Sequence, residues 1–366
     1  MDKKRPLTER ELQEIVDNFS DFDEDIVDFA DESEGEEEVI QYNVYDSESE
    51  QSAVEDLDYT HELDNQGDEF FYIGKDEENV WKSTPVSFTS KTRSKNIIKI
   101  LPGSKGAAKT VPNHLESFYI FISNEMIDNI VTCTNLYIDN KKQNFARDRD
   151  CKITSSTEVQ ALFGALYIIA VKKGNRVDVR ELWSTDGTGM IRLRAAFSYR
   201  RFLFLLRALR FDNINTRKER QNIDNLAAIR DIYSDFAKNC MNNYIPGEFI
   251  AIDEMLHPFR GRCGFVQYMP QKSTKYGIKI YALCDSRTYY TWNLEIYCGQ
   301  QRDGPFQTSN KPFDIVQRLV DPLKNSKRNL RTDNYYTSYP LANYLLQNGL
   351  TLIGTIKKNK KEIPRN

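Results

Sequence analysis

The sequence predicts a layered α/β protein, preceded by a mostly helical region and by an acidic tail without stable structure. Three observations support this: acid-rich low-complexity blocks near the start, helical apolar spacing in the middle, and short strands alternating with helices after Gly247. We expect a disordered tail over residues 1–78, a basic linker or arm over 79–114, a helical domain over 115–246 and an α/β domain over 247–366.

The acidic tail carries most of the negative charge. Residues 1–80 hold 29 Asp and Glu against 5 Lys and Arg, a net charge of −24, which leaves 25 acids, 45 bases and a net charge of +20 for residues 81–366. Blocks such as DESEGEEE bury too little apolar surface to fold. An apolar stripe behind a capping box at Thr8 and Glu11 is typical of a helix that docks on a protein partner, or of a transient helix without a role.

The basic remainder of the chain indicates a polyanionic partner, and nucleic acid is the commonest one. The alternative is an ordinary basic surface that faces the chain's own acidic tail. Residues 79–115 contain no acid, and their lysines and arginines are spread among small and polar residues. Such a stretch tracks phosphates, acts as a nuclear import signal or serves as a solvated linker. We expect a nuclear protein that binds double-stranded DNA.

Cysteine and apolar patterns exclude several other classes. The six cysteines include no C-x-x-C pair, and together with three scattered histidines they predict no zinc site. The longest apolar run, Val159–Val171, is too short to span a bilayer. We therefore expect a soluble intracellular protein with reduced thiols and no membrane partner.

The middle of the chain predicts core helices. Residues 155–174 place serines before an apolar stretch and Gly174 after it, as start and stop signals. Residues 199–211 are apolar nearly all round, with arginines at the margins. A third stripe follows helical spacing from Ile229 to Tyr244.

The period changes after Pro246-Gly247. Residues 248–253, 276–285 and 289–299 have strand patterns, and the last two are joined by a short turn. A helix over 312–323, a strand over 329–333, a helix over 338–349 and a strand over 350–358 follow. In this order the first and fourth strands can be neighbours in one sheet.

Two aspartates end these two strands. Asp253 ends the first and Asp333 the fourth, so neighbouring strands would bring both carboxylates to one crevice. Carboxylates are hard ligands suited to Mg²⁺ or Mn²⁺, although strand-end acids also cap helices or face water. Nearby, His257 is expected as a packed loop residue and Asp285 as a hairpin turn residue. Glu254 is expected either as a supporting acid or as an exposed partner of Arg260 or Arg262.

A family resemblance appears around both aspartates. IDEMLHPFRGRCGFVQYMPQKSTKYGIKIYALCD around Asp253 and TDNYYTSYPLANYLLQNGLTLIGTIKKNKKEIP around Asp333 resemble the two aspartate blocks of the piggyBac family of DDE transposases. FLLRALRFDN and YIPGEFIAIDE are similar to the family's upstream segments. The resemblance implies an RNase H-like mixed sheet, a helical domain with dimerisation or DNA-binding roles, and two catalytic, metal-binding aspartates, Asp253 and Asp333.

The resemblance also implies a DNA-facing set of basic side chains, namely Arg260, Arg262, Lys272, Lys275 and Lys279. The parent activity is cut-and-paste transposition through cleavage and transfer of DNA strands with two metal ions. The family's further metal-binding aspartate lies in a later GGVD-like block, and the sequence given stops at Asn366. We therefore expect an incomplete metal site and no strand cleavage by this chain alone.

Three hypotheses follow. The chain is part of an active transposase, a transposon-derived protein that binds DNA without cutting it, or an interaction protein whose acidic tail does the work. A homodimer is an open possibility in each case.

Overall fold

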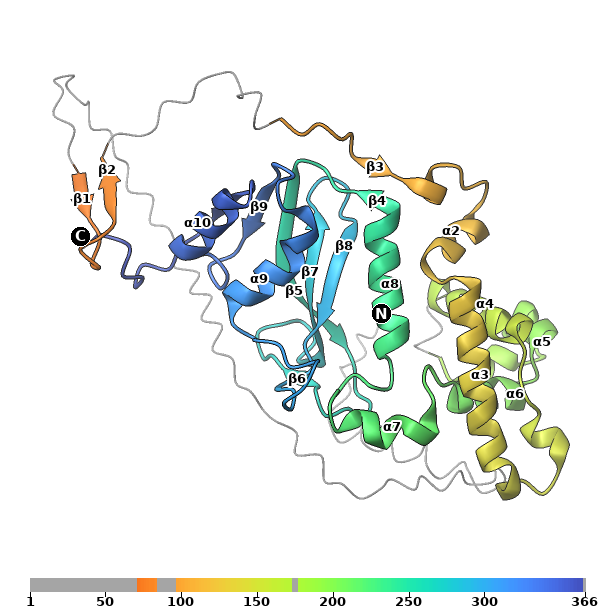
Figure 1. Ribbon diagram of the computed structural model, residues 1–366. Helices are drawn as coiled ribbons and strands as arrows, with labels where there is room; N and C mark the ends of the chain where they lie inside the picture. The colour runs from red at the N-terminus through yellow and green to blue at the C-terminus, as the bar shows by residue number, and fades with distance from the viewer. Residues whose placement is uncertain (1–70, 84–96, 173–176, 365–366) are drawn as a thin grey trace, which may run out of the picture. The chain divides into compact units, whose positions relative to one another are not determined.

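The computed structural model describes residues 71–83, 97–172 and 177–364 (Figure 1). The acidic tail as far as residue 70, including the helix expected after Thr8, lies outside these residues, as do residues 84–96 of the basic arm. The described chain divides into two compact units. One comprises residues 122–221 and 226–232, and the other holds the sheet. No helix within the described ranges has the length and apolar character needed to cross a membrane.

The first unit is helical. Its elements are α3 (Asn124–Lys141), α4 (Ser156–Val171), α5 (Ile191–Ala196), α6 (Tyr199–Ala208), α7 (Ile214–Gln221) and the first turn of α8 (Arg230–Asn243). Serines at positions 123, 155 and 198 cap α3, α4 and α6, each accepting a hydrogen bond from a backbone N–H of the first turn. The helices predicted over 155–174 and 199–211 are thus confirmed, the first with its predicted serine start signal.

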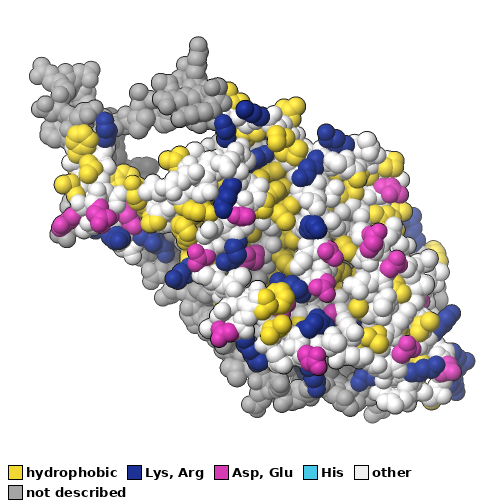
Figure 2. All heavy atoms as spheres, viewed as in Figure 1, with side chains coloured by type: hydrophobic (Ala, Val, Ile, Leu, Met, Phe, Trp, Pro, Cys, Tyr) yellow, Lys and Arg dark blue, Asp and Glu magenta, His cyan; other side chains and the backbone are white. Residues whose placement is uncertain are grey.

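Apolar side chains from four of these elements form the core of the helical unit. The cluster includes Ile138, Leu162, Leu193, Phe202 and Leu205, all at most 2% exposed. Of the arginines predicted at the margins of α6, Arg201 lies over the Phe204 ring, 5.2 Å from its centroid. Figure 2 shows Lys and Arg side chains interspersed with Asp and Glu over the drawn face of the molecule, rather than gathered in one patch.

The second unit is built on a six-stranded mixed sheet. Its strands are β5 (Phe249–Pro258), β6 (Gln267–Tyr268), β7 (Tyr276–Asp285), β8 (Thr291–Ile296), β9 (Asn329–Thr332) and β10 (Thr351–Gly354). The order is β10-β9-β5-β7-β6, with β8 also paired to β7. β10, β9 and β5 are parallel, whereas β5, β6 and β8 each run antiparallel to β7. The first and fourth predicted strands are therefore neighbours.

Two helices contribute to the core of the sheet unit. α9 (Pro312–Val320) and α10 (Tyr339–Gln347) begin with Pro near the first turn and place Ile315, Leu319 and Leu345 in one cluster with Ile250 and Leu283 of the sheet. α2 (His114–Phe121) and most of α8 belong to this unit as well. A short pairing of β3 (Gly103–Ser104) with β4 (Tyr244–Ile245) completes it.

The structure departs from the sequence prediction in several strands. The strands expected over 289–299 and 350–358 are shorter, and β6 was not predicted. β5 continues to Pro258 instead of ending at Asp253, because β7 pairs with it over its whole second half. A hairpin of β1 (Phe71–Ile73) and β2 (Val80–Lys82) begins inside the stretch expected to be disordered. The Trp81 indole donates to the Glu362 carbonyl at 2.7 Å, and Gly74 bridges to Pro364, so the hairpin lies against the last described residues.

Candidate metal centre

Strand pairing positions the two predicted aspartates. β5 and β9 are paired from Phe249↔Asn329 to Ile252↔Thr332, and the next residue on each strand is Asp253 or Asp333. Because neighbouring parallel strands carry residues of equal register side by side, Asp253, which continues within β5, lies beside Asp333, which directly follows β9. Asp253 therefore marks the end of one pairing, not the end of its strand.

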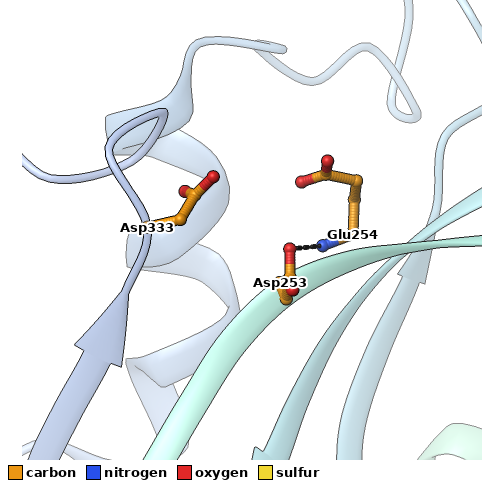
Figure 3. A group of neighbouring side chains, drawn as sticks. All are labelled: Asp253, Glu254 and Asp333. Atoms are coloured by element: carbon orange, nitrogen blue, oxygen red, sulfur yellow. Dashed lines mark hydrogen bonds between the residues drawn. The ribbon is translucent and has the colours of Figure 1, made fainter. Parts of the chain in front are cut away.

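Three carboxylates meet at this point. Asp253, Glu254 and Asp333 each offer an oxygen, and these oxygens all lie within 4.8 Å of one another. Figure 3 shows the Glu254 and Asp333 side chains directed toward each other above Asp253. The Asp253 carboxylate accepts a hydrogen bond from the Glu254 backbone N–H at 2.7 Å, which fixes the aspartate beside its neighbour.

A tight turn after β9 holds Asp333. Its carboxylate accepts hydrogen bonds from the backbone N–H groups of Tyr335 and Tyr336 at 3.1 and 3.4 Å. Its carbonyl oxygen accepts one from the Thr337 hydroxyl at 2.6 Å, and the hydroxyls of Thr332 and Thr337 are 2.8 Å apart. These short-range contacts are those of an Asx-type turn that leads into α10.

Glu254 enters the cluster because two groups hold its side chain. The Tyr336 hydroxyl donates to one carboxylate oxygen at 3.4 Å, and the Lys272 ammonium lies 3.4 Å from the other. The Glu254 side chain is only 11% exposed. The prediction of an exposed partner for Arg260 or Arg262 is therefore wrong, because its ion-pair partner is Lys272.

The acidic cluster is electrostatically strained in the absence of a cation. Burial raises the pKa of Asp333, and repulsion by Glu254 adds to that rise. Burial around the carboxyl, with repulsion by Glu254 and Asp333, likewise raises the pKa of Asp253, although the residue as a whole is exposed. The nearby Lys272 charge opposes both shifts. Like charges close together in a partly desolvated place account for these directions.

This donor set fits a hard divalent cation. Mg²⁺ and Mn²⁺ bind carboxylate oxygens, and three such groups converge here from two strands. A cation between them would relieve the repulsion that raises the pKa values of the aspartates. His257 lies outside the cluster, and the prediction of a packed loop residue is wrong, because His257 is exposed and lies within β5.

The five basic residues predicted to face DNA fall into two groups. Arg260, Arg262 and Lys275 are exposed on the segment that joins β5 to β7. Lys272 instead points to Glu254. Lys279 is only 3% exposed, and its ammonium lies 5.1 and 5.5 Å from the ring centroids of Tyr281 and Tyr335.

Burial is also the largest cause that lowers the pKa of Lys279, while Glu254 and both aspartates oppose it. Lys279 pairs with Leu256 across β5 and β7, which places it diagonally from Glu254, the partner of Tyr281. It therefore belongs to the surroundings of the acidic cluster rather than to the exposed surface of the segment that carries Arg260 and Arg262.

The sequence prediction did not include the tyrosine and lysine contacts of Glu254. The only signal available was spacing, since Tyr335 and Tyr336 closely follow Asp333 and Lys272 lies between two paired strands.

Asp285, predicted as a turn residue, accepts hydrogen bonds from the backbone N–H groups of Arg287 and Thr288, as expected. It also accepts one from Gly247 at 2.6 Å and is buried.

Comparisons with known proteins identify the family of this chain. A family model described as "Transposase IS4", of the DDE class, matches residues 113–366, which is more than half of the chain. The human PiggyBac transposable element-derived protein 3 is 23% identical over 251 residues, covering 67% of this chain and 40% of that protein. The human Chimeric ERCC6-PGBD3 protein has the same identity over 251 residues, which are 22% of its length.

A solved structure is similar in both sequence and fold. A chain of the cryo-EM structure of a piggyBac transposase synaptic complex with hairpin DNA aligns with a TM-score of 0.66 and 35% identity over 72% of this chain. The alignment spans 55% of that chain, so the present sequence corresponds to about half of it. The mixed sheet, the two aspartate blocks and the family match together show that this chain belongs to the piggyBac family of DDE transposases and transposase-derived proteins.

Proposed function

We propose that this protein binds double-stranded DNA and holds a divalent cation, Mg²⁺ or Mn²⁺, at Asp253 and Asp333. The convergence of these aspartates at the ends of the β5–β9 pairing, in a chain of this family, carries the proposal. The reaction class that such a site serves is cleavage and transfer of phosphodiester strands, as in cut-and-paste transposition. The proposal includes a nuclear location for the protein, because the nucleus is the compartment that holds this DNA.

The protein's own residues have distinct tasks in this proposal. Asp253 and Asp333 supply the cation ligands, and Glu254 adds a third carboxylate from the next position on β5. The turn contacts of Asp333 keep its carboxylate in place before any cation arrives. The chemistry that bound Mg²⁺ or Mn²⁺ supplies at such a site is stabilisation of negative charge on phosphoryl oxygens.

Charge supports DNA as the partner. Residues 81–366 carry a net charge of +20, and Arg260, Arg262 and Lys275 are exposed on the segment between β5 and β7, next to the strand that carries Asp253. Arginine and lysine contacts to phosphates make affinity fall with salt, in proportion to the number of contacts. The related transposase is named as a complex with hairpin DNA, which agrees with this choice of partner.

Two measurements on the full chain test the proposal. Titration with Mn²⁺, followed by electron paramagnetic resonance of the free ion, should show binding that Asp333→Asn removes. Binding of labelled duplex DNA should weaken steeply with salt and survive Asp333→Asn. Mn²⁺ binding that is unchanged in Asp333→Asn would contradict the metal site, and DNA binding that does not respond to salt would contradict the phosphate contacts.

A plasmid assay then separates cleavage from binding alone. Relaxation of supercoiled plasmid in Mg²⁺ by the wild type, and not by Asp253→Asn, would assign strand cleavage to this chain. Bound but intact plasmid would assign it a DNA-binding role without cleavage.

A further inference from the structure

Two ammonium groups accompany the three carboxylates, and their surroundings differ. Lys279 is fixed on β7 and buried against Tyr281 and Tyr335. Lys272 lies in the loop between β6 and β7, and its side chain is 38% exposed. Of the two, only Lys272 has room to move its charge into solvent.

The Lys272 loop is itself well held. The Lys272 backbone N–H donates to the Met269 carbonyl at 3.1 Å, and the Met269 N–H donates to the Lys275 carbonyl at 2.8 Å. The loop therefore presents the Lys272 stem to the acidic cluster from a fixed backbone, while the four-carbon side chain stays free to rotate.

We propose that Lys272 is a resident counter-cation that pairs with Glu254 in the metal-free protein and is displaced when a divalent cation binds, so that Lys272 weakens metal binding. This inference rests on the proposed metal site. Lys272 is thus a positioning residue for Glu254 before the metal arrives and a competitor for the same carboxylate when it does.

Charge and geometry carry the argument. The Lys272 ammonium lies 3.4 Å from a Glu254 oxygen, and that residue's carboxylate is within 4.8 Å of those of Asp253 and Asp333. A divalent cation among these oxygens would lie a few ångströms from a positive charge and be repelled by it. A partly exposed ion pair contributes little to stability, so exchange of the ammonium for the metal costs little.

The loop offers a matched control. Lys275 lies three residues away, carries the same charge and is exposed. Lys272→Met removes the counter-cation. Lys275→Met removes an equal charge from the same loop, and Lys272→Arg keeps the positive charge but carries it on a guanidinium group. Lys272→Gln is the second charge-removing variant, for use if Lys272→Met does not fold.

Mn²⁺ titration of the full chain, followed by electron paramagnetic resonance, tests the proposal. Lys272→Met should bind Mn²⁺ more tightly than the wild type by up to about 5-fold, because no ion pair with Glu254 has to be broken first. Lys275→Met and Lys272→Arg should stay close to the wild-type Kd. The melting temperature should rise more on adding Mn²⁺ in Lys272→Met than in the wild type.

Three other outcomes would each contradict a different part of the proposal. Unchanged or weaker Mn²⁺ binding in Lys272→Met contradicts competition, and equal tightening in Lys275→Met shows a general charge effect of the loop. If Asp333→Asn binds Mn²⁺ as the wild type does, or the wild type binds none, the metal site itself is contradicted. That result differs from one in which the site binds Mn²⁺ and Lys272→Met changes nothing.

Discussion

Ile252 and Thr332 are the last paired residues of β5 and β9, and each is followed directly by an aspartate. Both residues are buried, Ile252 in the apolar core and Thr332 beside the Thr337 hydroxyl at 2.8 Å. The buried register of two parallel strands thus places Asp253 beside Asp333. The acidic cluster is a consequence of sheet packing, and changes to that packing should alter metal binding.

Thr337→Val should weaken the cluster without removing a ligand. The substitution leaves the buried Thr332 hydroxyl without this partner and removes the bond to the Asp333 carbonyl, at a cost of about 1–3 kcal/mol in unfolding free energy. Chemical denaturation should show this loss, and Mn²⁺ affinity should fall because the Asp333 turn loosens. Thr308→Val, at an exposed position, is the control and should change neither quantity.

Asp333→Asn should raise the stability of the metal-free protein. The folded-state pKa of Asp333 is raised, so the stability tied to its protonation is present below the ordinary value of 3.8 and is lost as pH rises through the folded pKa. At neutral pH the charged carboxylate is therefore a cost that Asn avoids. The melting temperature in a chelator should rise in the variant, and the gain that Mn²⁺ gives the wild type should vanish. A lower melting temperature in chelator would contradict the repulsion.

Asp285→Asn should destabilise the sheet unit in a pH-dependent way. Burial alone would raise the pKa of Asp285, but hydrogen bonds from the N–H groups of Gly247, Arg287 and Thr288 lower it below 3.8. The stability from this carboxylate is present above pH 3.8 and is lost as pH falls through the lowered pKa. Denaturation near pH 7 should show a loss of about 1–3 kcal/mol, which shrinks toward acid pH. Asp303→Asn, at an exposed position, should show neither effect.

Asp212→Asn should destabilise the helical unit. The Asp212 side chain is buried and pairs with the guanidinium groups of both Arg217 and Arg220. The loss of these charged hydrogen bonds should cost about 1.5–3 kcal/mol, since the arginine side chains are 22% and 32% exposed and remain partly hydrated. Thermal unfolding should therefore begin at lower temperature. An unchanged midpoint would show that the two arginines find other partners.

Exposed and buried basic residues should differ in their effect on DNA binding. Replacing both Arg260 and Arg262 by Ala should lower the slope of log K against log salt by about 2, since each phosphate contact contributes about one. Lys279→Met removes a positive charge from a buried position, so the slope of log K against log salt should stay unchanged. A similar drop in slope for both variants would show that Lys279 reaches the DNA.

Much of the fold could be predicted because its elements have strong local patterns. Ser155 and the apolar run behind it define α4, and the strand pattern of 276–285 coincides with β7. The end of β5 was misplaced at Asp253, since an acid after an apolar run has the local pattern of a strand end. The second half of β5 is held by pairing with β7, a long-range contact that no local pattern shows.

The candidate site could be predicted only in part for the same reason. Asp253 and Asp333 could be predicted as site residues because each follows a short apolar strand pattern in the sequence. The places of Glu254, Lys272 and Lys279 depend on which side chains meet across the sheet and its loops, which spacing along the chain does not show. The burial of Lys279 involves Tyr281 on its own strand and also Tyr335, which lies 56 residues further along the sequence.

The central claim is that Asp253 and Asp333 share one divalent cation, and Mn²⁺ binding by the two single variants and the double variant tests it most directly. If one cation bridges the pair, Asp253→Asn and Asp333→Asn should each abolish the Mn²⁺ binding seen in the wild type, and the double variant should show no further loss. Binding that each variant reduces independently, with additive losses in the double variant, would contradict a shared site.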